Sequence, residues 1–295
     1  MEQELNEILF NSLNEQGFIL QEKCSEMINE TSSLTRWHLH TTEHPVSLKD
    51  QDTRIDIIIR ETGLSNSSKF GVIECKRVNP AYHCWLFGNP LYETPVHAKA
   101  QIVKLSVGNN DDLNIVPIRH DFDLNTYIIT NWWMQVNINP RKERNKKYSD
   151  PQPLENAFIQ ACLGVGGLLT ERIRQISKTI KDGAKEFYDI TDTYFIPIVV
   201  TTCHLYVTRY DLSDVDISNG SIEKDKLSFV GLPNSPEPVN WVLVDYGAPI
   251  KTIPDMIFEN FHGVDPVDLE PYNRRSIFVV SSSHLTDFLA DLHTF

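Results

Sequence analysis

The sequence lacks paired cysteines, long apolar runs and a basic start. Its five cysteines are widely scattered and include no Cys-x-x-Cys pair, which argues against a disulfide framework and against a structural zinc site. The opening MEQELNEILF carries acidic residues where a secretory signal needs basic ones. No later segment approaches the roughly eighteen apolar residues of a membrane span. We therefore expect a cytoplasmic protein that is neither exported nor inserted in a membrane.

Basic residues are also scarce relative to acidic ones, with 27 Lys and Arg against 40 Asp and Glu. The formal net charge is −13, which repels polyanions at long range and disfavours indiscriminate binding to nucleic acid. An enzyme that gathers carboxylates around a divalent cation is nevertheless acidic at its own site, and a few local basic groups can hold a phosphate backbone. Hydrophobic residues make up 41% and charged residues 23% of the 295 residues. This ordinary composition excludes a disordered or fibrous chain.

The apolar patterning predicts an α/β or α+β domain with a mixed central sheet flanked by helices. We expect residues 1–210 to form the core with additions. Residues 211–295 are rich in Asp, Asn, Ser, Gly and Pro, and are expected to form a C-terminal extension that packs on the core without being an independent domain. A break is expected near Gly166, because glycine weakens a helix. Helices are predicted at 2–16, 96–107, 154–181 and 283–292, and strands at 18–24, 37–42, 54–60, 70–76, 126–136, 195–201, 204–210 and 276–280.

Three residues carry the chemistry that the pattern favours. Side chains alternate along a strand, so Glu74 and Lys76 share one face. Asp56 lies in the middle of an apolar run on the preceding predicted strand, where an unpaired charge is costly to bury. Mg²⁺ prefers oxygen ligands and is commonly held by one or two carboxylates. We therefore predict a magnesium site formed by Asp56, Glu74 and the backbone carbonyl of Cys75, with Lys76 orienting a water for phosphodiester hydrolysis.

Four segments together resemble the PD-(D/E)XK, or restriction-endonuclease-like, nuclease superfamily. They are TRIDIIIR, FGVIECKR, the predicted helix AKAQIVKL and the predicted strand YIITNW, within roughly residues 1–135. The resemblance implies a mixed sheet flanked by helices, dependence on Mg²⁺ or Mn²⁺, and cleavage of nucleic acid, usually DNA, as in restriction or anti-phage defence. By motif position, Asp56 and Glu74 would be metal ligands and Lys76 the catalytic lysine. Gln101 matches a glutamine often found on the following helix.

The superfamily often adds a glutamate from the first helix, and here its identity is open. On a helical wheel Glu4 borders the apolar stripe that contains Leu5 and Leu9, so it is a candidate for a further metal ligand. Glu43, shortly before Pro45, is an equal alternative. The second metal position therefore stays undecided at this point.

A basic loop next to two tryptophans is a candidate nucleic-acid contact, although most such runs are merely solvated. Trp132 and Trp133 are expected in the core rather than as stacking platforms. The loop residues concerned are Arg141, Lys142, Arg144, Lys146 and Lys147.

The acidic residues and the lysine are also compatible with a protein that has no catalytic activity. Asp56 could pair with Arg54 or Arg77 at a strand end, and Glu74 with Lys76 could form a solvated face. The chain would then be a non-catalytic binding or assembly subunit. The intact acid, acid and lysine set favours the enzyme, whose target choice could depend on a homodimer or on a recruiting partner protein.

Overall fold

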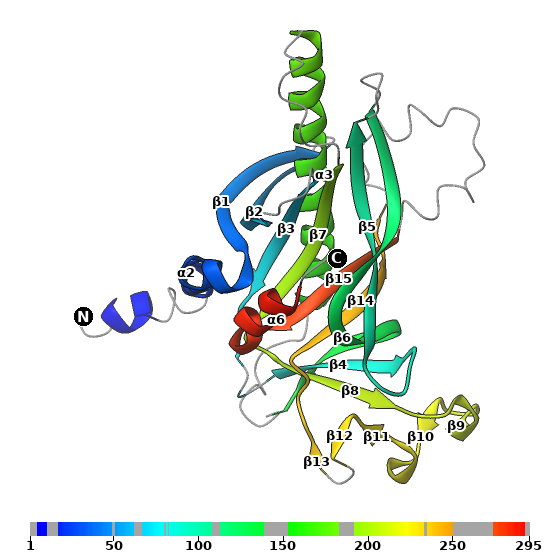
Figure 1. Ribbon diagram of the computed structural model, residues 1–295. Helices are drawn as coiled ribbons and strands as arrows, with labels where there is room; N and C mark the ends of the chain where they lie inside the picture. The colour runs from blue at the N-terminus through cyan, green and yellow to red at the C-terminus, as the bar shows by residue number, and fades with distance from the viewer. Residues whose placement is uncertain are drawn as a thin grey trace.

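The computed structural model describes residues 5–10, 17–48, 51–61, 67–79, 81, 83–107, 113–138, 153–182, 192–232, 235–249 and 274–292. Of these residues, 54% lie in strands and 32% in helices. The predicted α/β or α+β class is therefore wrong: the chain is mostly β, and part of its 11-stranded sheet closes into a barrel. Figure 1 shows the barrel strands below and beside the long helix α3.

Five strands pair in a ring. Strand β5 pairs with β6, β6 with β14, β14 with β15, β15 with β7, and β7 again with β5. Beyond β7 the sheet continues through β3 and β2 to β1, and beyond β6 it continues through β4 and β8 to β11. The bounds are β1 Trp37–Leu48, β2 Gln51–Glu61, β3 Ser67–Lys76, β4 His83–Pro90, β5 Val96–Val107, β6 Leu113–Asn137, β7 Asp192–Thr201, β8 His204–Arg209, β11 Ser228–Phe229, β14 Trp241–Gly247 and β15 Arg274–Ser281.

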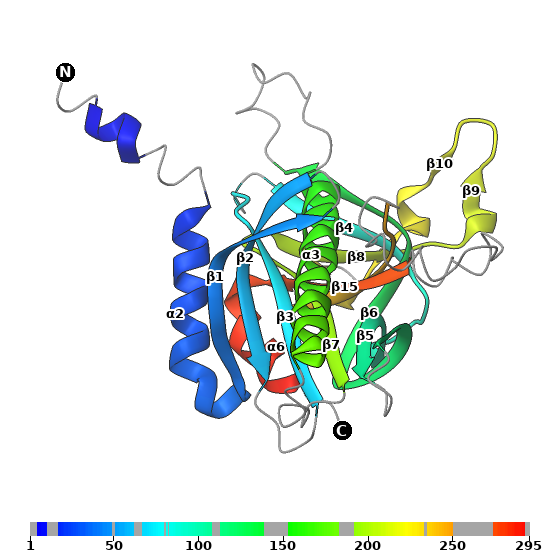
Figure 2. The ribbon, with the colours of Figure 1, turned by 90° about the horizontal axis from the view of Figure 1, so that it is seen from above.

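Helices cover both faces of the β1, β2, β3 and β7 region. Helix α3 lies along one face, and α2 with α6 lies against the other (Figure 2). The remaining short elements lie mostly between β8 and β14. The bounds are α2 Phe18–Thr35, α3 Pro153–Lys181, α6 Leu285–Asp291, the 3₁₀ turns Leu212–Asp214, Lys224–Lys226 and Ser282–His284, and the short strands β9 Val215–Asp216, β10 Ser221–Ile222, β12 Gly231–Leu232 and β13 Ser235–Pro236.

Branched apolar residues explain why β2 and β3 form buried strands. Ile57 and Ile59 pack on the α2 side, while Ile58 and Val72 pack on the α3 side. This alternation places both faces of the strands in apolar cores, which suits the flat, branched side chains of isoleucine and valine. The predicted strands at 54–60 and 70–76 are confirmed.

The segment predicted as a strand at 18–24 is instead the first part of α2. Its buried residues Gln21, Cys24, Ile28 and Thr35 recur at helical spacing, so the apolar face becomes visible only when the window extends past Cys24. The helix ends at Arg36, which adopts a left-handed conformation and donates its backbone N–H to the carbonyl of Ser32.

The segment predicted as a helix at 96–107 is strand β5. Ala98, Ala100 and Ile102 are buried and separated by more exposed residues, which is the period of two that a strand requires. Alanine disfavours strands by itself, so pairing with both β6 and β7 overrides the local preference.

Helix α3 is continuous from Pro153 to Lys181, so the expected break near Gly166 is wrong. The other predicted strands fall within β1, β6, β7 and β15, and the strand predicted at 204–210 is β8, which ends one residue earlier. The helix predicted at 283–292 largely coincides with α6. Among the described residues, no helix is long and apolar enough to cross a membrane.

Candidate active site

Strands β2 and β3 bring the predicted acids side by side. Their antiparallel register ends at the pair Ile57 and Ile73, and continuing it by one residue places Asp56 opposite Glu74. Beyond that pair, the carboxylate of Asp56 accepts the backbone N–H of Cys75 at 2.7 Å. The Asp56 side chain thus takes the place of a main-chain acceptor where the ladder stops, which fixes its position beside β3.

Helix α2 holds Asp56 from the other side. Gln21 donates its side-chain amide to the backbone carbonyl of Asp56 at 2.9 Å. The thiol of Cys75 faces α2 as well, where a hydrogen bond with Cys24 and burial raise the pKa of Cys75 well above its usual value. The backbone of Cys75 therefore faces the site, whereas its thiol faces α2.

Lys76 lies between one carboxylate of the sheet and one amide of α3. Its Nζ is 3.1 Å from Oε1 of Glu74 and donates to Oε1 of Gln160 at 2.8 Å. The Lys76 side chain is 27% exposed and that of Glu74 is 9% exposed, so the lysine is the more accessible of the two. Three side chains from β3 and α3 thus meet at one point.

Burial makes both acids easier to protonate than carboxylates in water. Burial raises the pKa of Glu74 to about 7, with a further contribution from the charge of Asp56, and the Lys76 ammonium only partly opposes this. Burial also raises the pKa of Asp56, against the lowering effect of the Cys75 N–H. Two ionised carboxylates in this position therefore need additional positive charge.

Glu43 joins this group from β1. The register that pairs Thr42 with Ile57 and His44 with Ile55 leaves Glu43 opposite Asp56, and its charge contributes to the raised pKa of both Asp56 and Glu74. Its carboxylate also lies 3.5 Å from Arg54. Of the two glutamates considered from the sequence, Glu43 adjoins the site, whereas Glu4 lies outside the described residues.

Comparison with known proteins does not identify the function of this site. No protein-family model, no curated protein and no solved structure matches the chain. The chemistry must therefore be inferred from the site itself.

Gln101 is not part of this cluster. It lies on β5 instead of on a helix, and its backbone N–H donates to the hydroxyl of Ser276 on β15 at 2.8 Å. The glutamine that meets Lys76 is Gln160 on α3, which was not predicted from the sequence. The sequence did contain a signal for Gln160. This residue lies three positions after Ala157 and two after Phe158, which are buried residues of the predicted long helix, so the helical period places Gln160 at the border of the buried face.

The predicted basic loop, Arg141, Lys142, Arg144, Lys146 and Lys147, lies outside the described residues. Its neighbour Trp133 packs against Phe158 and Tyr246, and Trp132 donates its indole N–H to the hydroxyl of Tyr210 at 3.0 Å. Both tryptophans therefore make contacts within the protein.

The donor set fits a hard divalent cation that keeps much of its water. Among the described residues, no cluster of three or more His, Cys, Asp or Glu side chains is arranged to hold a metal. Two adjacent carboxylates, Asp56 and Glu74, are sufficient for Mg²⁺, which is commonly bound by one or two carboxylates with water and substrate phosphate completing the shell. Zinc usually takes histidine or cysteine ligands in addition to carboxylates, so a site of two carboxylates suits Mg²⁺ better.

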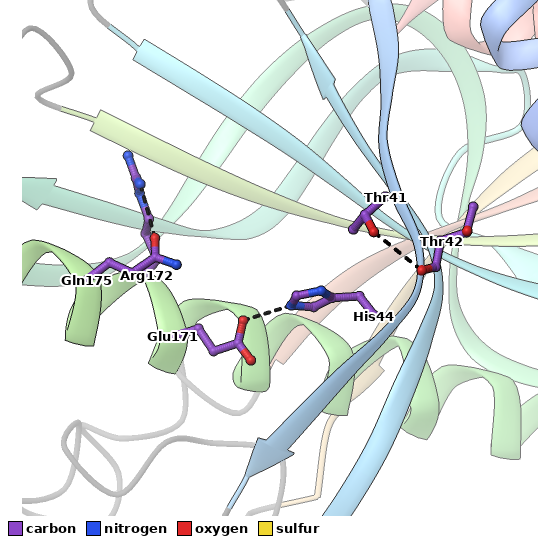
Figure 3. A network of polar contacts seen from close by, with 6 residues as sticks. All are labelled: Thr41, Thr42, His44, Glu171, Arg172 and Gln175. Carbon is purple, nitrogen blue, oxygen red and sulfur yellow. Dashed lines mark hydrogen bonds and ion pairs between the residues drawn. The ribbon is translucent and has the colours of Figure 1, made fainter.

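Two cavities lie away from the cluster. One, of about 650 Å³, is lined by residues of β4, β6 and β8 and by the segment after β8. Its cations Arg209 and Lys226 are paired with Glu93 and Asp214. The other, of about 290 Å³, lies between α3 and the strands β1, β2 and β3; Figure 3 shows His44 of β1 pointing toward Glu171 of α3 at its edge.

Proposed function

We propose that the chain is a metal-dependent nuclease that hydrolyses phosphodiester bonds of nucleic acid, with DNA as the first substrate to test. The observation that supports this is the meeting of Asp56, Glu74 and Lys76 on two neighbouring strands, with both carboxyl groups raised in pKa. The resemblance to the PD-(D/E)XK superfamily rests on these residues and not on the overall fold.

Asp56 and Glu74 would hold a Mg²⁺ or Mn²⁺ ion. The backbone carbonyl of Cys75 would complete the protein ligands, because the N–H and C=O of one strand residue point to the same neighbouring strand, and the Cys75 N–H already points to Asp56. When bound, the ion would polarise the phosphate and acidify a water.

Lys76 and Gln160 would act on the reacting phosphate. The Lys76 ammonium is held at 2.8 Å by Gln160 and at 3.1 Å by Glu74, so little reorganisation is needed when negative charge develops on the phosphate oxygens. Lys76 can also orient the attacking water, whose hydroxyl joins phosphorus while its proton passes to the departing sugar oxygen. Glu74 accepts the ammonium hydrogen bond and keeps Lys76 on the reactive side.

A cleavage assay tests this proposal. Purified protein is incubated with supercoiled, linear and single-stranded DNA and with RNA, in Mg²⁺ or in EDTA. We expect cleavage in Mg²⁺ alone and a loss of at least about a hundredfold in Lys76→Ala, in the range of removing one charge-stabilising donor. Lys99→Ala is the matched control, because Lys99 is 65% exposed on β5 and paired with the exposed Asp121. Metal-independent cutting, or equal activity of both variants, would reject the mechanism.

Metal binding is measured separately by calorimetry with Mn²⁺. Asp56→Asn retains an acceptor for the Cys75 N–H but removes the charge, so we expect a folded protein with binding lost. Asp121→Asn removes an exposed carboxylate and should bind like the unaltered protein. Full binding by Asp56→Asn would place the ion elsewhere.

A further inference from the structure

The cavity between α3 and the strands β1 to β3 contains two guanidinium groups that form no ion pair with any described residue. Its volume is about 290 Å³, and its floor is apolar, with Phe70 and Phe195 stacked beneath it. The polar residues at its walls are His40, His44, Arg60, Glu171, Arg172 and Gln175.

Arg60 and Arg172 form no ion pair with any described residue. Arg60 donates its Nε to the hydroxyl of Ser68 at 3.0 Å, and its guanidinium lies 5.8 Å from the ring centroid of Phe70. Arg172 makes one long hydrogen bond, of 3.4 Å, to Gln175, and its buried Nε has no hydrogen-bond partner in the described part of the chain. An unpaired buried donor on a charged group is costly, so this pair of guanidinium groups is incomplete as it stands.

The carboxylate of Glu171, at the edge of the cavity, does not neutralise them. Glu171 lies 2.8 Å from Nε2 of His44, and Figure 3 shows this contact turned away from the Arg172 side chain. Burial, with the charge of Arg60, lowers the pKa of Arg172, and burial together with Arg60 likewise lowers that of His40. Arg60 and Arg172 therefore repel each other across the cavity.

We propose that this cavity binds a phosphate group through Arg60 and Arg172. Arginine presents a planar fork of donors that matches phosphate oxygens, and the terminal nitrogens of Arg60 and Arg172 supply such donors. His40 at the rim can add one further hydrogen bond. A dianion here would cancel the repulsion between the two guanidinium groups.

Its position assigns the phosphate to the substrate strand, an assignment that rests on the proposed nuclease function. Asp56 and Arg60 are four residues apart on β2, or about 13 Å. Gln160 and Arg172 are twelve residues apart on α3, or about 18 Å. At about 3.4 Å per nucleotide along one strand, this span corresponds to roughly four or five nucleotides. A nucleic-acid strand cleaved at Lys76 could thus place a neighbouring phosphate in the cavity.

The first experiment does not depend on cleavage. Inorganic phosphate and a mononucleotide are titrated in turn into the full chain in EDTA, and calorimetry measures the affinity. The thermal midpoint of unfolding is measured as well, because a ligand of the folded state raises it. We expect Arg172→Gln to weaken binding at least tenfold without lowering the thermal midpoint, because it also removes the repulsion with Arg60. Arg174→Gln removes the same charge from an exposed position two residues along α3 and should bind as the unaltered chain does.

The second experiment identifies the source of the phosphate. Steady-state cleavage is measured on oligonucleotides of three and of twelve nucleotides. If the substrate strand fills the cavity, Arg172→Gln lowers kcat/KM about tenfold on the long substrate and leaves the short one unchanged. If the chain binds phosphate but the effect of Arg172→Gln on cleavage does not depend on substrate length, the cavity binds a free phosphate compound instead.

The outcomes separate the two proposals. No cleavage of any substrate by the unaltered chain rejects the nuclease, while calorimetry still decides whether the cavity binds phosphate. The cavity proposal is overturned if the unaltered chain binds neither inorganic phosphate nor the mononucleotide, or if Arg172→Gln and Arg174→Gln bind them equally.

Discussion

At the scale of single residues, the candidate site combines a buried carboxylate with a lysine that is partly exposed. Glu74 is 7% exposed, and the cation that touches it, Lys76, also donates to Gln160. A buried carboxylate with a shared ammonium is less stable in its ionised form than a carboxylate in water. The raised pKa of Glu74 therefore affects the stability of the fold as well as metal binding.

The stability of the metal-free protein should therefore fall as the pH rises. The pKa of Glu74 is raised from 4.5 to about 7, so between these values the folded chain binds more protons than the unfolded chain, and the free energy of unfolding decreases with pH. The free energy of unfolding falls by about 3 kcal/mol in total, and this decrease is complete above pH 7. Urea unfolding in EDTA from pH 5 to 8 measures it. Glu74→Gln, which stays uncharged, should lack this decline; parallel curves for both proteins would contradict it.

Two glutamines give a contrasting pair of predictions. Gln160→Ala removes the acceptor that directs the Lys76 ammonium, so we expect kcat on DNA to fall about tenfold or more with little change in KM, since orientation of a charged group is lost. Gln101→Ala should leave activity unchanged, because Gln101 contacts β15 through its backbone. Steady-state kinetics of the two variants compares them directly, and a larger loss in Gln101→Ala would show that the sequence assignment was right and the geometric one wrong.

At the scale of elements, α3 lies unusually close to the sheet. A Cβ atom built on Gly167 would come within 2.6 Å of the Cβ of Val46 on β1, and one on Gly164 within 2.9 Å of Val72 on β3. The glycines that lower helix propensity therefore allow the approach that brings Gln160 to Lys76. Packing against the sheet compensates for the local preference, which explains why the helix has no break.

Gly167→Ala should destabilise the protein despite the higher helix propensity of alanine. The new methyl group would meet the Val46 side chain at its Cβ, which cannot move away without moving the backbone of β1. Such overpacking destabilises a protein by about 1 to 3 kcal/mol, which exceeds the gain of about 1 kcal/mol in helix propensity. In a Val46→Ala background the contact is gone, and the same substitution should be neutral or stabilising. Chemical unfolding of the four proteins of this cycle measures the coupling, and additive effects would show that the close approach is not limiting.

Sequence patterns located strands β2 and β3 of the candidate site because the information that specifies them is local. The branched run around Asp56 and the alternation of Glu74, Cys75 and Lys76 specify strands by themselves. The strand at 96–107 and the helix at 18–35 were missed because short windows fit both periods, and pairing of β5 with two neighbours decided between them. Gln160 was missed because its contact with Lys76 spans 84 positions in the sequence, a distance that no periodicity reports.

At the scale of the whole molecule, the barrel combines strands from the middle of the chain with two strands near its C-terminal end. β14 and β15 lie between β6 and β7 and are part of the barrel, and both belong to the segment expected from the sequence to be a C-terminal extension that packs on the core. Hydroxyl Oγ of Ser276 on β15 accepts the N–H of Gln101 and donates to Asp245 at 2.5 Å, which links three of the five barrel strands. Closure of this ring could not be predicted, because the order of strands in a sheet is not written in their individual patterns.

Ending the chain after Asn240 should prevent folding, because it removes β14, β15 and α6 and leaves β6 and β7 with unpaired edges inside the structure. Circular dichroism should show no cooperative thermal transition. As a control, replacing residues 215–222 with a short glycine and serine linker removes β9 and β10, which pair with each other in a separate two-stranded sheet; we expect a thermal midpoint within a few degrees of that of the full chain. A folded truncated chain would show that the barrel can form without its last two strands.

Strand β7 belongs to the barrel and also pairs along its full length with β3. Its amide hydrogens from Ile198 to Val200 lie where β3 pairs on one edge and β15 on the other, so we expect them to exchange with deuterium only through opening of the entire molecule. Glu74 and Lys76 lie on β3, which pairs with this segment, whereas Gln160, the acceptor for Lys76, lies on a separate helix. Exchange at the site should therefore differ between its strand residues and its helix residue.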